Sequence, residues 1–160
     1  MKFIKYFLQY LIIMTFFIIF KILGYKKSSD LGAFMFIKIG HFFRSKKILE
    51  KNLNNINIYS QDKDYNKIVS EMWENYGRIF ADYASIKNFR NDKLEKFIEI
   101  EGIEVLEKIK NKKKPVIFIS GHFNNFELMA MIIEKNAINL SAIYRPLNNI
   151  FLNKIMENIR

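Results

Sequence analysis

Apolar positions at the start of the chain form one continuous run rather than a one-sided pattern. The run extends from Tyr6 to Phe20 and is interrupted only by Gln9 and Thr15. A membrane-spanning helix needs about 20 apolar residues and rarely fewer than about 17, so the run reaches that length only if Ile22 and Leu23 are included. No small-residue cleavage site follows it, as a signal peptide would require. The run therefore predicts a membrane anchor, with a buried core helix as the alternative.

A second apolar segment, residues 34–43, leads directly into a basic helix. The basic residues are Arg44, Lys46, Lys47 and Lys51. Apolar residues beside a basic cluster suit a helix that rests on an anionic membrane surface. We therefore expect residues 1–53 to form a membrane anchor with a basic interfacial helix, and His41 to be packed or interfacial. Nucleic-acid binding is the competing use of a basic region, but this segment is too continuously apolar for an exposed base-stacking surface.

From Asp64 onward the pattern becomes that of a soluble helix. Apolar residues recur at three- and four-residue spacing, which indicates one buried face. They are Ile68, Val69, Met72, Trp73, Tyr76, Phe80 and Tyr83. Asp64 is a candidate cap for the helix start, and a loop is expected over residues 87–92. Residues 97–102 then alternate like a short edge strand, and the apolar positions of residues 103–109 predict a short helix.

The C-terminal part of the chain alternates between strand and helix. Residues 116–120 are continuously apolar, as expected for a short strand in a sheet that is covered on both faces. Residues 140–144 predict a second strand. A helix that begins at Asn124 or Asn125 and ends near Asn136 joins the two.

Two strands joined by a helix are expected to be parallel, with a right-handed crossover. We therefore predict an α/β fold for residues 54–160. Ligands of such sheets gather outside the carboxyl ends of the strands. His122 follows the first of these ends and Arg145 follows the second, so both are expected on one edge of the sheet.

The charge of the chain is strongly basic and unevenly spread. The formal net charge is +10. Residues 1–51 carry ten Lys and Arg against Asp30 and Glu50, whereas residues 52–160 carry sixteen basic and fourteen acidic side chains. An AT-rich genome would also produce a chain rich in Lys, Asn, Ile and Phe, but it would not explain this location. Three lysines behind the first apolar run, against two ahead of it, place the following domain in the cytoplasm.

The residue inventory excludes several kinds of site. The chain has no cysteine and only two histidines. Disulfides, thiolate metal sites and histidine-rich metal sites are therefore excluded. Carboxylate-bound Mg²⁺ is not excluded, but no cluster of Asp and Glu argues for it. We predict no metal and no cofactor.

His122 and Glu127 form the candidate acid/base pair. Histidine titrates near neutral pH, and a partner carboxylate can fix its tautomer. Five residues of helix would place the two side chains about 140° apart, so they can meet only if His122 lies in the turn before the helix and Glu127 in its first turn. The competing interpretation is a capping box, in which Asn124 caps the helix and Glu127 steadies its end.

Two motifs and their order in the chain resemble the lysophospholipid acyltransferase superfamily. The motifs are residues 120–127 (SGHFNNFE), which contain H-x4-E, and residues 144–146 (YRP). Weaker features follow in the same order: the N-terminal apolar segment, 46–53 (KKILEKNL), 72–78 (MWENYGR) and 100–102 (IEG). Within the superfamily, the chain is most similar to the late acyltransferases of lipid A biosynthesis, the lauroyl/myristoyl transferase family. The similarity covers essentially the whole chain.

The resemblance implies a function and roles for particular residues. It implies an acyltransferase that moves a fatty acyl group from acyl-acyl carrier protein to a hydroxyl of a lipid A precursor at the bacterial inner membrane. His122 is then the general base, Glu127 orients it, and Arg145 holds anionic groups or developing negative charge. Asn124 and Tyr144 are further candidates for substrate binding. The implied fold is a glycerolipid-acyltransferase-like α/β sandwich, preceded by membrane-associated helices.

Family members continue beyond the amphipathic segment 151–159, so the chain is expected to be the N-terminal portion of a longer protein, with an incomplete sheet. Two alternatives stay open. One is an acyltransferase with another glycolipid or glycerolipid acceptor. The other is a non-enzymatic, basic membrane-surface protein that is a truncated remnant of such an enzyme.

Overall fold

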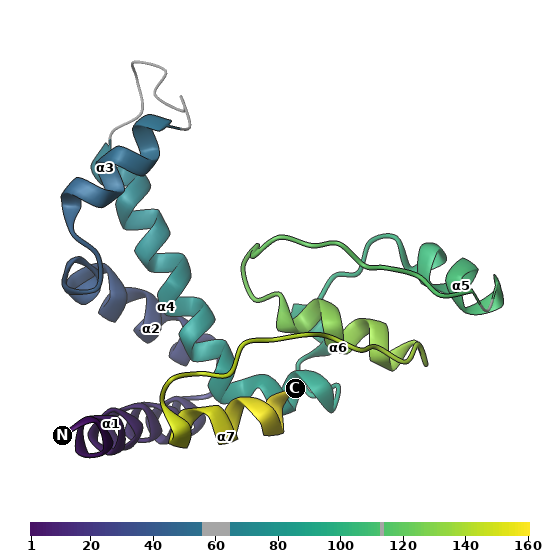
Figure 1. Cartoon of the computed structure of the whole chain (residues 1–160), viewed down its shortest axis with the longest axis horizontal. Coiled ribbons are helices and arrows are strands. Elements are labelled where there is room, and N and C mark those ends of the chain that lie inside the picture. Colours follow the sequence, from purple (N-terminus) through teal and green to yellow (C-terminus); the bar gives the residue numbers. More distant parts are fainter. Residues whose placement is uncertain (56–64, 113) are drawn as a thin grey trace. The chain divides into compact units, whose positions relative to one another are not determined.

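The computed structural model describes residues 1–55, 65–112 and 114–160 (Figure 1). The chain forms two compact units, Met1–Phe16 with Ser85–Arg160 (the terminal unit) and Phe17–Ala84 (the middle unit). The helices are α1 (Lys2–Leu23), α2 (Tyr25–Ile39), η1 (Gly40–Phe42), α3 (Lys46–Asn55), α4 (Tyr65–Arg90), η2 (Glu95–Phe97), α5 (Ile103–Lys112), α6 (Glu127–Lys135) and α7 (Ile150–Ile159). The predicted division into residues 1–53 and 54–160 stays a prediction.

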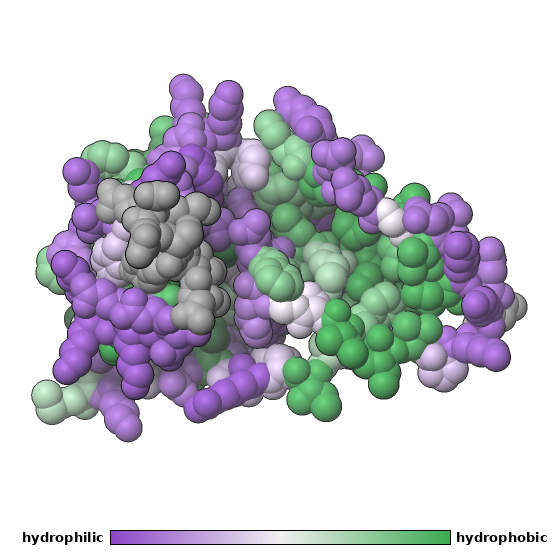
Figure 2. All heavy atoms as spheres, turned by 90° about the horizontal axis from the view of Figure 1, so that it is seen from above, coloured by the Kyte–Doolittle hydropathy of each residue, from purple (hydrophilic) through white to green (hydrophobic). Residues whose placement is uncertain are grey.

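Every regular element in the described residues is helical, so the predicted α/β fold is wrong. Residues 116–120 and 140–144, the two predicted strands, run as irregular chain. A strand in a sheet covered on both faces buries its side chains, yet Ile117, Ile119 and Ile143 are 88%, 93% and 107% exposed. Figure 2 shows apolar (green) surface over this part of the terminal unit. Hydrophobic runs alone therefore did not specify strand pairing here.

The helix predictions fared better than the strand predictions. Helices are present after the second apolar segment (α3), along the apolar stripe (α4), over residues 103–112 (α5) and between the predicted strands (α6). The loop expected over 87–92 is wrong, because α4 continues to Arg90. The edge strand expected over 97–102 is also wrong, because η2 leads into irregular chain. The predicted cap Asp64 lies outside the described residues.

The middle unit is built on a close crossing of α2 and α4. Gly32 and Gly77 face each other at the crossing, and a methyl group on either would overlap the backbone of the other. Ala33 and Ala81 are also buried there. Small residues let two helix backbones approach, so the interaxial distance is set by glycine and alanine rather than by large side chains.

Aromatic rings fill the rest of the middle unit. The ring of Phe80 lies 5.5–5.8 Å from the rings of Phe17, Phe20 and Phe36. Trp73 is buried, and the backbone of Gly40 lies directly against its indole. The predicted packing role of the single tryptophan is therefore confirmed.

Arg78 ties α4 to α2 at the edge of the middle unit. Its guanidinium donates to Asp30 at 2.9 Å, to Ser29 at 3.1 Å and to Glu74 at 2.7 Å. The hydrogen bond with Asp30, followed by that with Glu74, raises the pKa of Arg78 above its ordinary value. These side chains remain partly exposed, so the network contributes orientation more than stability.

In the terminal unit, α6 packs against the last turns of α4. Met131 and Ile133 of α6 are buried. Arg90 donates to Glu134 at 2.9 Å and to the carbonyl oxygen of Ile159 at 3.0 Å. Arg90 therefore joins α4 to both α6 and α7. Lys135 forms an ion pair with Asp92 just beyond the end of α4.

The other contact of α7 is with the N-terminal half of α1. The ring of Phe151 lies 5.2 Å from Phe3, 5.5 Å from Phe7 and 5.7 Å from Tyr10. Just before α7, the buried Asn149 accepts hydrogen bonds from the backbone N–H groups of residues 151 and 152, which caps the helix. A helix far along the sequence thus packs on the first turns of the chain.

Candidate active site

His122 lies in the irregular segment before α6, and its side chain is exposed. Its imidazole meets the ring of Phe126 edge-on, with 4.9 Å between the ring centroids. Asn124, at the bend of this segment, has a φ of 46°. Asparagine tolerates this left-handed conformation better than most residues. His122 therefore precedes the helix, as predicted, but it lies in irregular chain.

Glu127 is the first residue of α6 and is buried, with 6% of its surface exposed. The predicted helix start is two or three residues early, because the residue that caps α6 is Phe126. No side-chain capping bond forms at this end, so the capping-box interpretation, with Asn124 as the cap, is wrong. A carboxylate in the first turn still interacts favourably with the helix dipole.

The partner of the Glu127 carboxylate is Arg160 rather than His122. Arg160 Nε lies 2.9 Å and Nη2 2.8 Å from Glu127 Oε1. Within the described residues, no hydrogen bond joins His122 to Glu127. A buried carboxylate is costly unless it is paired and hydrogen-bonded. The guanidinium meets that requirement with a charge-assisted hydrogen bond from Nε and an ion-pair contact from Nη2.

Arg160 also connects Glu127 to the second motif. Its guanidinium carbon lies 5.0 Å from the centre of the Tyr144 ring, which is a cation–π contact. The Tyr144 hydroxyl donates to Glu157 Oε1 at 3.3 Å, and Asn153 donates to the same oxygen at 2.8 Å. The structure therefore brings Glu127 and Tyr144 together through a residue of the C-terminal end.

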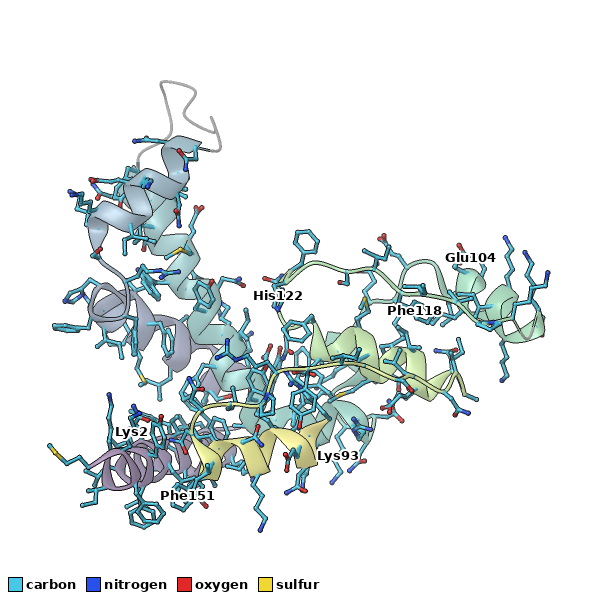
Figure 3. The ribbon with its side chains drawn as sticks, in the orientation of Figure 1. Lys2, Lys93, Glu104, Phe118, His122 and Phe151 are labelled. Atoms are coloured by element: carbon cyan, nitrogen blue, oxygen red, sulfur yellow. The ribbon has the colours of Figure 1, made fainter. Side chains whose placement is uncertain are left out.

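The side chains of the remaining predicted site residues, Arg145 and Asn124, form no hydrogen bond or ion pair with the group formed by Glu127, Arg160 and Tyr144 in the described residues. Arg145 is exposed, with its guanidinium in no ion pair among the described residues. Asn124 is exposed as well. The expected edge shared by His122 and Arg145 does not form, because the strands that would have created it are absent from the described residues. Figure 3 shows His122 at the bend of its irregular segment.

Sequence reasoning missed Arg160. The only available signal was its position at the end of the amphipathic segment 151–159, which is α7 in the structure. A basic residue at a helix end is common. Its pairing with Glu127, 33 residues away in sequence, depends on the packing of α7 near α6 and was not encoded in any local spacing.

Comparison with known proteins identifies one match. The family model described as bacterial lipid A biosynthesis acyltransferase matches residues 1–160. No curated protein and no solved structure was found to match the chain. The family match covers both motifs and the segments that contain Glu127, Tyr144 and Arg160.

Proposed function

The chain belongs to the bacterial lipid A biosynthesis acyltransferase family, and we propose that it moves a fatty acyl group from acyl-acyl carrier protein to a hydroxyl of a lipid A precursor. The family match makes the chain an acyltransferase whose acceptor is a lipid. The proposal places the reaction at the bacterial inner membrane, on the cytoplasmic side. The observation that carries it is the family match over the whole chain, with an exposed His122 five residues before a buried Glu127.

His122 is the general base in this proposal. Its neutral imidazole takes the proton of the acceptor hydroxyl while the oxygen attacks the thioester carbonyl of the donor. The C–O bond of the ester forms and the C–S bond breaks, and the proton passes from the imidazolium to the departing thiolate. A base must lie within hydrogen-bond reach of the proton that it removes. The exposure of His122 leaves its ring open to a substrate.

Glu127 orients His122 in this proposal, and Arg160 holds the carboxylate in place. Both Arg160 contacts are made with Oε1. Among the described residues, Oε2 accepts no hydrogen bond, and it is therefore the oxygen that would accept the imidazole N–H. A rotation of the His122 side chain away from Phe126 would be needed, which is common when a catalytic pair tightens around substrate.

The substrate-binding residues of the proposal are Arg145, Asn124 and Tyr144. Arg145 is exposed and free to bind phosphate groups of the acceptor or the developing negative charge. The basic N-terminal third of the chain suits an anionic lipid and an acidic carrier protein. Tyr144 acts in part through Arg160, over which it stacks.

The test is acyl transfer by the full chain in lipid nanodiscs, with labelled acyl-acyl carrier protein and a lipid A precursor. His122→Ala should lower turnover by roughly 10²–10⁴-fold, the usual contribution of a general base. His41→Ala is the matched control, because it removes the only other histidine and should keep near-normal turnover.

Assays with other acceptor lipids test the acceptor separately from the role of His122. Transfer to a lysophospholipid or to another glycolipid, with none to the lipid A precursor, would contradict the acceptor and keep the acyltransferase. Near-normal transfer by His122→Ala would contradict the role of His122. The side chain is exposed, so a folded variant is expected, and an unchanged thermal midpoint confirms it.

A further inference from the structure

Helix α1 has two apolar faces that differ in what covers them. One face is partly or fully buried by protein, at Tyr6, Tyr10, Ile13, Phe17 and Phe20. The other is exposed, at Ile4, Leu8, Leu11, Ile12, Ile18 and Ile22. Both sets recur at three- and four-residue spacing, so each forms a stripe along the helix. We call the second set the exposed stripe.

The protein contacts of the first turns of α1 are specific. Besides the rings that surround Phe151, the side chain of Asn149 donates to the carbonyl oxygen of Tyr6 at 2.9 Å and to Gln9 Oε1 at 3.3 Å. Asn149 is 7% exposed, and its own oxygen caps α7. One carboxamide therefore fixes the start of α7 on the second and third turns of α1. Figure 3 shows Phe151 beside α1.

These contacts are incompatible with a membrane-spanning α1. From Phe3 to Leu23 the helix rises about 30 Å, the thickness of the hydrocarbon core of a bilayer. Among the described residues, α1 is the only helix long and apolar enough to cross. If it crossed, residues 85–160 would lie on the opposite side from Phe3. They instead pack on Phe3, Phe7 and Tyr10.

Moving α7 into the bilayer together with α1 does not resolve the conflict. Lys154 and Glu157 are exposed on α7, and Asn153 is half-buried. Charged side chains in the hydrocarbon region are costly without a partner or a water-filled cavity. The charges of α7 therefore belong at the membrane surface or in water.

We propose that α1 lies in the plane of the membrane interface, with the exposed stripe in an anionic lipid surface, and does not cross the bilayer. Lysines flank the helix at both ends, at positions 2, 5, 21, 26 and 27, and anionic headgroups attract such residues. The proposal rests on the membrane location proposed above. It brings α7, and with it the Arg160–Glu127 pair of the same unit, to the lipid surface that holds the acceptor.

Single cysteines test this topology, because the chain has none of its own. Lys2→Cys marks the start of α1, and Lys93→Cys marks the turn after α4; both side chains are exposed (Figure 3). A membrane-impermeant maleimide should label both in inverted inner-membrane vesicles and neither in intact spheroplasts. Labelling of Lys2→Cys in spheroplasts, with Lys93→Cys labelled only in inverted vesicles, would show a spanning helix and overturn the proposal. A Lys2→Cys variant that is labelled only after detergent is added would also overturn the proposal.

An oxidative cross-link tests whether the contact of α1 with α7 persists in the membrane. Phe7→Cys with Phe151→Cys should form a disulfide in native membranes, seen as faster migration on a non-reducing gel. Leu8→Cys with Phe151→Cys is the matched control, because Leu8 belongs to the exposed stripe, and it should not cross-link. Equal cross-linking of the two pairs, or of neither, would contradict the packing. A chain found wholly in the soluble fraction would overturn the membrane location itself, whatever its acyl-transfer activity.

Discussion

At the scale of single residues, the central feature is a buried carboxylate whose charge is balanced by an arginine. Glu127 could have been held by His122 or by the start of its own helix, and it is held by Arg160. The arrangement leaves the imidazole exposed and without a tautomer-fixing bond in the described residues. In the proposed mechanism, the Glu127 carboxylate is already held in place by Arg160, whereas the His122 side chain must still turn toward it.

Arg160→Ala should destabilise the full chain by about 2–3 kcal/mol, because it leaves the Glu127 carboxylate buried without a partner. The cost is below that of a fully buried pair, since the Arg160 side chain is 29% exposed and water can reach it. The thermal midpoint, measured in detergent, checks this. Arg145→Ala is the control, because its exposed side chain pairs with no described residue and its loss should leave the midpoint unchanged.

At the scale of elements, the decisive contacts are made by helices that are distant in sequence. The α2–α4 crossing depends on Gly32 and Gly77, and the start of α7 depends on the carboxamide of Asn149. Neither glycine lies in a turn. Each is needed because two backbones approach too closely for a side chain to fit.

Gly77→Ala is expected to lower stability, although alanine is the better helix former. The gain in helix propensity is at most about 1 kcal/mol. The added methyl group overlaps the backbone oxygen of Gly32, and the helices must separate to admit it, which costs about 1–3 kcal/mol or more. The midpoint of thermal unfolding should therefore fall.

Asn75→Ala is the control for Gly77→Ala, because it isolates the effect of helix propensity. Asn75 is exposed on the same helix, so its replacement carries the propensity gain without the overlap and should raise the midpoint slightly. A Gly77→Ala variant that unfolds at or above the wild-type midpoint would show that the crossing is looser than the structure indicates.

At the scale of the whole molecule, the candidate active site and the first turns of α1, which carry part of the proposed membrane-binding surface, belong to the same terminal unit. That unit contains His122, Glu127, Tyr144 and Arg160 as well as the first turns of α1. An enzyme that acylates a lipid needs its reactive groups at the lipid surface. An α1 that lies in the interface would meet that need within one compact unit.

Leu8→Glu with Ile12→Glu should release the chain from anionic liposomes. Burying each of these side chains in lipid contributes about 1.5–3 kcal/mol, so their loss should weaken binding on the order of 100-fold or more. Liposome co-sedimentation measures it. Leu8→Met with Ile12→Met keeps the apolar surface and should bind normally. Binding that survives the two glutamates would place the lipid contact elsewhere.

Local pattern was sufficient for most helices and for the position of His122. The three- and four-residue spacing along α4 and the apolar positions of α5 predicted both helices. The spacing of His122 and Glu127 predicted that His122 precedes the helix and that Glu127 lies in its first turn, and both positions are observed, although the two side chains do not pair. Helices form by hydrogen bonds between residues four apart, so nearby sequence carries most of the information needed to find them.

The sequence by itself determined the helices, the H-x4-E and YRP motifs and the family, because each is recorded in residues close together along the chain. Only the tertiary structure decided that residues 116–120 and 140–144 are unpaired in the described chain, that Arg160 holds Glu127, and that α7 packs on the first turns of α1. Strand pairing, a buried ion pair and a helix–helix contact all require partners from distant segments. Their free energy exists only after those segments have come together, and no local spacing specifies which partner arrives.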